Sequence, residues 1–133
     1  MQIKTFGHFM IFKILFLVLR YLFAVVLVYM GASHFFHPNS YTPFVPSFLG
    51  HEIYVVYISG FLQTILGLLL FSAGKTAKIS AFFAVLLMVA YLPIRINDCL
   101  ASEPVVGNFE LACYILAGQI ALVFISYRIY RRL

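Results

Sequence analysis

The sequence predicts an all-α integral membrane protein, an antiparallel bundle of four transmembrane helices with both termini in the cytoplasm. Hydrophobic residues make up 64% of the 133-residue chain and charged residues only 10%, unlike an ordinary soluble domain. The apolar residues gather into four stretches. Each approaches the ~20 residues that a helix needs to cross a hydrocarbon layer about 30 Å thick.

Four such helices nearly exhaust the chain, so we expect one membrane domain over residues 1–133. The spans are expected at 14–36, 53–72, 79–94 and 109–127. The connections are then two outer loops and one cytoplasmic joint, at 37–52, 95–108 and 73–78.

Charges at the span ends are sorted by sign. One side holds basic residues only: Lys4, Lys13, Lys75, Lys78, Arg128, Arg131 and Arg132. The other side holds the acidic residues and one arginine: Glu52, Asp98, Glu103, Glu110 and Arg95. Because Lys and Arg near span ends stay cytoplasmic, we expect a multi-pass protein of the bacterial cytoplasmic membrane. The scattered basic residues indicate anchors for lipid head groups rather than a nucleic-acid surface.

The first apolar stretch allows a second interpretation. Lys4 and Lys13 precede it, and it closes on Gly31-Ala32-Ser33, which resembles a signal-peptide cleavage site. Its length of about 20 residues exceeds the roughly 7 to 15 residues of a typical signal-peptide core. We therefore favour a retained first helix.

Polar and small residues inside the spans need an explanation. For Arg20, beside Tyr21, we favour a side chain that reaches the cytoplasmic head groups; the alternative is an anion or head-group site between helices. Small-residue stripes in the second and fourth spans predict close helix packing, with Gln63 hydrogen-bonding across the contact. The packing residues are Gly60, Thr64, Gly67, Ala117 and Ala121.

Pro93 is expected to kink or end the third span, which leaves Arg95, Asn97 and Asp98 in the outer loop. Ionisable residues near the hydrocarbon tend to find partners, so a pair between Arg95 and Glu52 or Asp98 is expected to clamp the outer rim. Such a pair would equally suit a quinone or lipid head group.

The first outer loop carries Pro38, Pro43 and Pro46, which restrict the backbone and predict a fixed re-entrant or surface-lying segment. A spaced motif begins at the end of the first span and continues through this loop into the second span. Its residues are Gly31, His34, Phe35, Pro38, Tyr41, Pro46, Ser59 and Gly60.

This motif, with Arg20-Tyr21 before it, resembles the DoxX family of small four-helix bacterial membrane proteins over residues 20–97. The resemblance implies association with a quinone or with a redox partner, because some relatives are subunits of a thiosulfate:quinone oxidoreductase. Two departures stand out. Gln63 replaces a glutamate common in the family, and Pro93-Ile94-Arg95 replaces its Pro-Ala-Asn triplet. A charge-dependent role for that glutamate cannot operate here.

The outer face also holds metal and thiol candidates. His34, His37 and His51 are weak candidates for zinc or copper ligands, because their spacing matches no recognised metal signature. Cys99 and Cys113 both fall on the oxidising side and are candidates for a disulfide; the alternative is a pair of free thiols.

The sequence thus predicts an accessory or structural subunit without its own catalytic activity, because nucleophilic triads, phosphate loops and paired catalytic carboxylates are all missing. Its expected partners are the lipid bilayer and a larger membrane complex or further copies of itself. The enzyme alternative is a quinone-linked oxidoreductase component with a site at His34, Gln63 and Arg95. A small transporter is a third class. The sequence itself requires no cofactor, and a quinone is the one that the resemblance implies.

Overall fold

The computed structural model describes residues 2–133 and the side chains of residues 5–133, so the Lys4 side chain lies outside the described part. These residues form helices and connections without a β-strand. The α-helices are α1 (Gln2–Phe36), α2 (Glu52–Leu69), α3 (Gly74–Leu100) and α4 (Phe109–Arg132). The short 3₁₀ helices are η1 (Pro38–Ser40), η2 (Thr42–Phe44) and η3 (Ser47–Leu49). All four α-helices are long and apolar enough to cross a membrane.

Three helices are longer than the sequence predicted, among them α4, which runs to Arg132 rather than ending at residue 127. α1 begins at Gln2 rather than at residue 14, and α3 runs to Leu100 rather than ending near residue 94. Pro93 was expected to kink or end the helix; because it lies inside α3, the second of these alternatives is wrong. The lost backbone hydrogen bond is outweighed because α3 packs along α4. Residues 95–98 therefore belong to α3, and the outer connection shrinks to residues 101–108.

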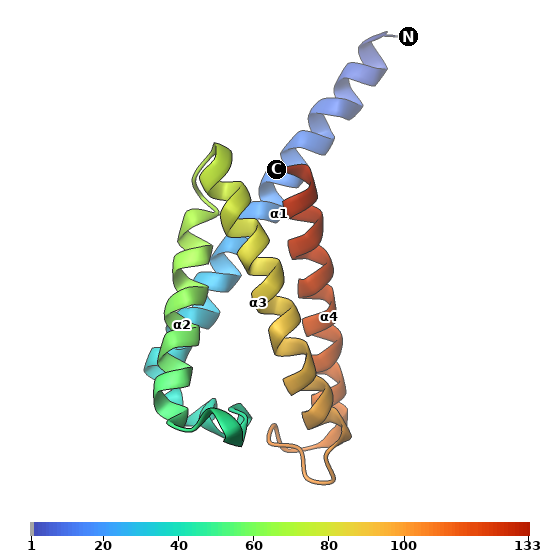
Figure 1. Cartoon of the computed structure of the whole chain (residues 1–133). Coiled ribbons are helices and arrows are strands. Elements are labelled where there is room, and N and C mark those ends of the chain that lie inside the picture. The colour runs from blue at the N-terminus through green and yellow to red at the C-terminus, as the bar shows by residue number, and fades with distance from the viewer. Residues whose placement is uncertain (1) are drawn as a thin grey trace.

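The helices pair as two antiparallel hairpins, α1 with α2 and α3 with α4, whereas α2 and α3 meet far less. Figure 1 shows the hairpins close together near the α2–α3 connection and apart at the opposite end. We call the end that holds residues 70–73 and the C-terminus the turn end. The end that holds residues 37–51 and 101–108 is the loop end.

Glycines bring α1 and α2 into backbone contact. A Cβ atom on Gly60 would lie 2.5 Å from the Cβ of His34, and one on Gly67 would lie 2.9 Å from the carbonyl oxygen of Ala24. Gly31 faces Gly60 from α1, where a Cβ would lie 2.7 Å from the Gly60 carbonyl oxygen. Small residues permit this close approach, which holds the first hairpin together.

The α3–α4 hairpin uses a different set of small residues. The buried face of α3 carries Ala77, Ser80, Ala81 and Ala84. On α4 the buried residues are Ala112, Gln119, Ser126 and Ile129. Ala117 and Ala121 are exposed, so the predicted packing stripe of α4 does not face the rest of the chain. Small residues lie on both faces of α4, and their spacing in the sequence did not show which face packs against α3.

Arg20 links α1 to the end of α2. The side chain is 7% exposed, its Nε donates to the Leu70 carbonyl oxygen at 2.8 Å, and its Nη2 donates to the Ser72 carbonyl oxygen. The ring of Tyr21 stacks on Phe71 beside it. The last carbonyls of a helix lack intrahelical partners. Arg20 therefore fixes the turn end of the bundle instead of reaching outward as the sequence suggested.

The main apolar core lies on the turn-end side of the bundle and joins the two hairpins. It contains Phe23, Ala24, Leu27, Leu70, Ala81, Ala84, Met88 and Ile129. The hydroxyl of Ser80 on α3 donates to the Leu66 carbonyl oxygen on α2 at 2.6 Å, which ties the hairpins at the same level. With this side closed, the divergence of the hairpins leaves space at the loop end.

Candidate functional site

Two adjoining cavities occupy the loop end between the hairpins. The deep cavity, about 470 Å³, lies between α2, α3 and the 3₁₀ segment and reaches Gln63, Tyr91 and Arg95. The rim cavity, about 660 Å³, lies between the same segment and the end of α3. Phe44, Val45, Pro46, Phe48, Pro93 and Ile94 line both. These volumes fall in the range of small-molecule sites, roughly 300 to 1,000 Å³.

Gln63 places an unsatisfied amide in the wall of the deep cavity. The residue is fully buried at 0% exposure. Its Oε1 accepts a long hydrogen bond, 3.3 Å, from the hydroxyl of Tyr91 on α3. Its Nε2 has no hydrogen-bond partner among the described residues. An unpaired buried donor costs about 1–3 kcal/mol. The amide nitrogen is therefore suited to a ligand with a hydrogen-bond acceptor.

Arg95 lies one helical turn beyond Tyr91 on α3 and also lines the deep cavity. Its guanidinium sits over the ring of Phe44, 4.7 Å from the ring centroid. Within the described part of the chain it forms no ion pair, so the predicted pair with Glu52 or Asp98 is wrong. Asp98 instead accepts a hydrogen bond from the Val105 backbone N–H at 2.7 Å. Arg95 thus presents a positive charge to the cavity.

His34 completes the wall of the deep cavity on the α1 side. It is 7% exposed and stacks on Tyr41 with ring centroids 4.0 Å apart. Its Nδ1 lies 2.7 Å from the Met30 carbonyl oxygen, which makes Nδ1 the donor. In the neutral imidazole, Nε2 is then an acceptor. His34 therefore combines a fixed orientation with one free ring nitrogen.

The motif residues from the sequence gather at this corner. Tyr41 follows η1, whose first residue is Pro38, and Pro46 directly precedes η3. Phe35 stacks on Tyr57 of α2 with centroids 5.7 Å apart. Ser59 lines the deep cavity, and its hydroxyl donates to the Val56 carbonyl oxygen at 2.9 Å. The motif therefore builds the α1–α2 corner and one wall of the cavity.

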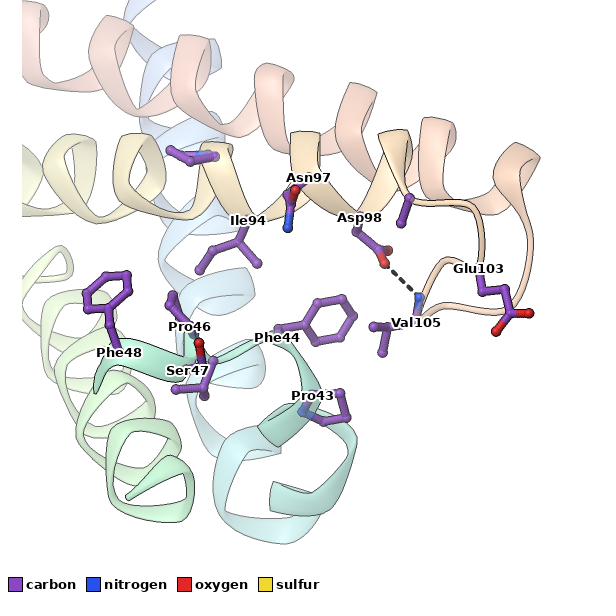
Figure 2. A pocket seen from close by; sticks show the side chains of 13 residues that line it. Pro43, Phe44, Pro46, Ser47, Phe48, Ile94, Asn97, Asp98, Glu103 and Val105 are labelled. Carbon is purple, nitrogen blue, oxygen red and sulfur yellow. Dashed lines mark hydrogen bonds between the residues drawn. The ribbon is translucent and has the colours of Figure 1, made fainter. Parts of the chain in front are cut away.

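Figure 2 shows the rim cavity in close-up, with Phe44, Pro46 and Phe48 on one side and residues of α3 on the other. Asn97 and Asp98 project from α3 toward the cavity, and a dashed line marks the hydrogen bond from Val105 to Asp98. Glu103 lies on the connection after α3. The rim is therefore acidic, while the deep cavity holds the arginine.

The weak metal candidates do not come together. Within the described residues, no group of three or more His, Cys, Asp and Glu side chains is placed to hold a metal ion. His37 and His51 are exposed, and His51 adopts a left-handed backbone, φ 36°, just before α2. His34 alone of the three lines the deep cavity.

The two cysteines meet at the loop end. Cys99 on the last turn of α3 and Cys113 on the second turn of α4 have their Sγ atoms 3.0 Å apart, as free thiols. The structure therefore brings the predicted disulfide partners into contact. They lie between α3 and α4, outside the residues that line the two cavities.

Sequence reasoning missed several residues of the site. Tyr91 and Phe44 contact the two polar residues that were predicted, Gln63 and Arg95 respectively. Tyr91 lies four residues before Arg95, which places both on one face of a helix. That spacing was a usable signal once α3 was known to continue past Pro93.

A model of a domain of unknown function, DUF8561, matches residues 23–130 of the chain. This match covers all four helices apart from the first part of α1. No curated protein and no solved structure matches the chain.

Proposed function

The chain belongs to the DUF8561 family, and we propose that it is a four-span accessory subunit of a bacterial cytoplasmic membrane. In this role it holds the polar head of a membrane-soluble ligand between its two hairpins. The observation that carries the proposal is the unpartnered Nε2 of Gln63, fully buried in the wall of the deep cavity. Buried polar groups are normally satisfied, so an orphaned donor beside a cavity indicates a missing acceptor.

The distribution of charged residues supports one orientation of the bundle in the membrane, with the turn end toward the cytoplasm. Lys75 and Lys78 lie in the first turns of α3, and Arg128, Arg131 and Arg132 lie at the end of α4, so all five gather at the turn end. The acidic residues of the chain lie at the loop end. Because basic residues are retained in the cytoplasm, the turn end and both termini face inward, and the cavities face outward.

The length of α1 supports a partner protein. α1 continues past the other helices at the turn end (Figure 1). Phe6, Phe9 and Phe12 on this extension are 58–69% exposed. Aromatic residues are enriched at protein interfaces, so the extension is suited to contact a larger membrane assembly.

A quinone-linked oxidoreductase component is the alternative function. His34, Gln63 and Arg95 line the same deep cavity, and a quinone carbonyl would accept a hydrogen bond from Gln63. The likeness to the DoxX family is part of this alternative, and it rests on the motif at the α1–α2 corner. Loss of a quinone-dependent activity in His34→Ala, without loss of folding, would support it.

Purification in mild detergent from the native membrane tests the proposal. The co-purifying proteins are identified by mass spectrometry, and lipid, quinone and metal are extracted and quantified. A stoichiometric larger partner, with a bound amphiphile that is lost in Gln63→Leu, is the expected result. A solitary chain that carries a redox-active quinone or metal would favour the enzyme alternative and refute the accessory role.

A further inference from the structure

Building on that proposed function, we infer that the ligand is a glycerophospholipid with an amino head group, bound with its phosphate at Arg95. Gln63 then donates to an ester carbonyl, and the ammonium lies at the acidic rim formed by Asp98 and Glu103. This names the chemical class of the ligand and assigns one polar contact to each part of its head group.

The order of polar groups along the cavities matches the order in such a lipid. Gln63 is level with Tyr91, Arg95 follows four residues later on α3, and Asp98 three residues after that. At 1.5 Å per residue these steps are about 6 Å and about 4.5 Å along the helix axis. The amide donor of Gln63, the guanidinium of Arg95 and the carboxylate of Asp98 thus follow one another toward the loop end. In an aminophospholipid, ester carbonyl, phosphate and ammonium follow one another in the same direction, a few bonds apart.

The charge of Arg95 favours a phosphate over a neutral head. A guanidinium binds phosphate with paired, charge-assisted hydrogen bonds. Arg95 lines the deep cavity and has no ion pair among the described residues, with only the Phe44 ring below it. A charged side chain near the hydrocarbon normally has a partner. Asp98, three residues along α3, interacts with this charge electrostatically but forms no ion pair with it. A quinone would satisfy Gln63 but give the guanidinium no anionic partner in the cavity.

The acidic rim distinguishes an amino head group from an anionic one. Asp98 is 6% exposed and lines the rim cavity, with Val105 donating to its Oδ1. Glu103 lines the same cavity. Two carboxylates beyond the phosphate position attract an ammonium and repel a second negative charge. A phosphatidylethanolamine head group satisfies both Arg95 and the rim, whereas phosphatidylglycerol satisfies Arg95 alone.

Apolar walls accommodate the start of the acyl chains. The deep cavity is bounded by Val55 and Val56 of α2, by Ala90 and Ile94 of α3, and by Leu49 of η3. The divergence of α2 and α3 opens this space between the hairpins (Figure 1). These apolar side chains are suited to contact the first part of the acyl chains.

Native mass spectrometry of the full chain in mild detergent tests the inference. Phosphatidylethanolamine, phosphatidylglycerol with the same acyl chains, and a short-tailed benzoquinone are each titrated into delipidated protein. Phosphatidylethanolamine is expected to bind about tenfold more tightly than phosphatidylglycerol, since a charge-assisted contact is worth about 1.5–3 kcal/mol. Arg95→Gln and Gln63→Leu should each lose about tenfold in affinity. Arg95→Lys keeps the charge but loses the paired hydrogen bonds, so it should bind with an affinity between those of the unmodified chain and Arg95→Gln. Lys75→Gln, at the turn end, should change nothing.

Asp98→Asn is the sharpest variant, because asparagine keeps an acceptor for Val105 while removing the charge. With Glu103→Gln added, the preference for phosphatidylethanolamine over phosphatidylglycerol should disappear while binding through Arg95 persists. Equal or tighter binding of phosphatidylglycerol by the unmodified chain would overturn the inference but leave the proposed site intact. Binding of the quinone alone would overturn it in favour of the redox alternative. If no amphiphile depends on Gln63 and Arg95, both the inference and the proposed ligand site fail.

Discussion

At the turn end, the guanidinium of Arg20 donates to the carbonyl oxygens of Leu70 and Ser72, whereas at the loop end the guanidinium of Arg95 has only the ring of Phe44. Two buried glutamines differ in the same way. Nε2 of Gln119 donates to the Met88 carbonyl oxygen at 2.7 Å, but Nε2 of Gln63 has no partner. Arg20 and Gln119 are thus satisfied within the chain, although Gln119 also lines the deep cavity. In the same cavity Gln63 and Arg95 keep a hydrogen-bonding or charged group free for a ligand.

Replacing the two arginines should have the largest effect and tests the comparison directly. Arg20→Met removes charge-assisted hydrogen bonds and leaves the end of α2 uncapped, so we expect the free energy of unfolding to fall by about 4 kcal/mol. Arg95→Gln should cost less than about 1 kcal/mol, because no hydrogen bond or ion pair is lost. Chemical denaturation in detergent, followed by circular dichroism, measures both. Equal losses would abolish the distinction between the ends.

A methyl group on Gly60 tests the contact that closes the α1–α2 hairpin. The new Cβ would lie 2.5 Å from the Cβ of His34 and 2.8 Å from the Gly31 carbonyl oxygen, so Gly60→Ala should destabilise the protein by about 3 kcal/mol. Gly118→Ala is the matched control on α4. No atom lies within 4 Å of its added Cβ, and the higher helix propensity of alanine should leave stability unchanged or raise it by up to about 1 kcal/mol. A mild effect at Gly60 would show that the hairpin is loosely packed.

The two glutamines should respond with opposite signs. Gln119→Leu loses a satisfied hydrogen bond and should lower stability by about 1 kcal/mol. Gln63→Leu removes an unpaired donor and only one long hydrogen bond, the 3.3 Å bond from Tyr91, so it should raise the stability of ligand-free protein by up to about 1 kcal/mol. The same Gln63→Leu variant should bind less lipid, which separates function from stability. Thermal unfolding of delipidated protein measures the first effect, and destabilisation by Gln63→Leu would mean that the hydrogen bond from Tyr91 outweighs the unpaired Nε2.

Oxidation of the cysteines should have the smallest effect on the cavities. Cys99 and Cys113 lie between the paired helices α3 and α4, away from the gap between the hairpins. A mild oxidant should join them, and non-reducing electrophoresis with intact-mass measurement should show a loss of about 2 Da that is absent in Cys113→Ser. Lipid binding should be the same in both redox forms. A change in binding on oxidation would show that α4 moves the cavity wall.

The sequence was sufficient to predict four apolar helices, because each apolar stretch is long and is separated from the next by turn residues and charges. The closeness of Gly60 and Gly67 to α1 also follows the expected role of small residues. Helix ends were predicted less well. The influence of Pro93 depends on packing along α4, which no local signal reports, and Arg20 could not be matched to carbonyls 50 and 52 residues away.

The sequence predicted individual residues of the candidate site but not the cavity that they line. Gln63 was identified as a polar residue in an apolar span, His34 from the spaced motif, and Arg95 as a charge at the outer rim; all three line the deep cavity. The cavity itself depends on how far the hairpins diverge, which is set by the core at the turn end. The pairing of Asp98 with Val105 rather than Arg95 depends on the path of residues 101–108.

The unequal lengths of α1 and α2 have a consequence for the bilayer around them. α1 has 35 residues and α2 has 18, so the paired helices measure about 52 Å and about 27 Å. Even at a tilt of about 40°, α1 would extend about 40 Å along the membrane normal, more than the hydrocarbon thickness of about 30 Å. At the same tilt α2 would extend only about 21 Å. Relative to the hydrocarbon thickness, α1 of this hairpin is thus too long and α2 is too short. The excess length of α1 includes Lys13 and the residues before it, which the charge pattern places in the cytoplasm. In a membrane of uniform thickness, the short α2 would therefore favour thinning of the lipids on one side of this hairpin only.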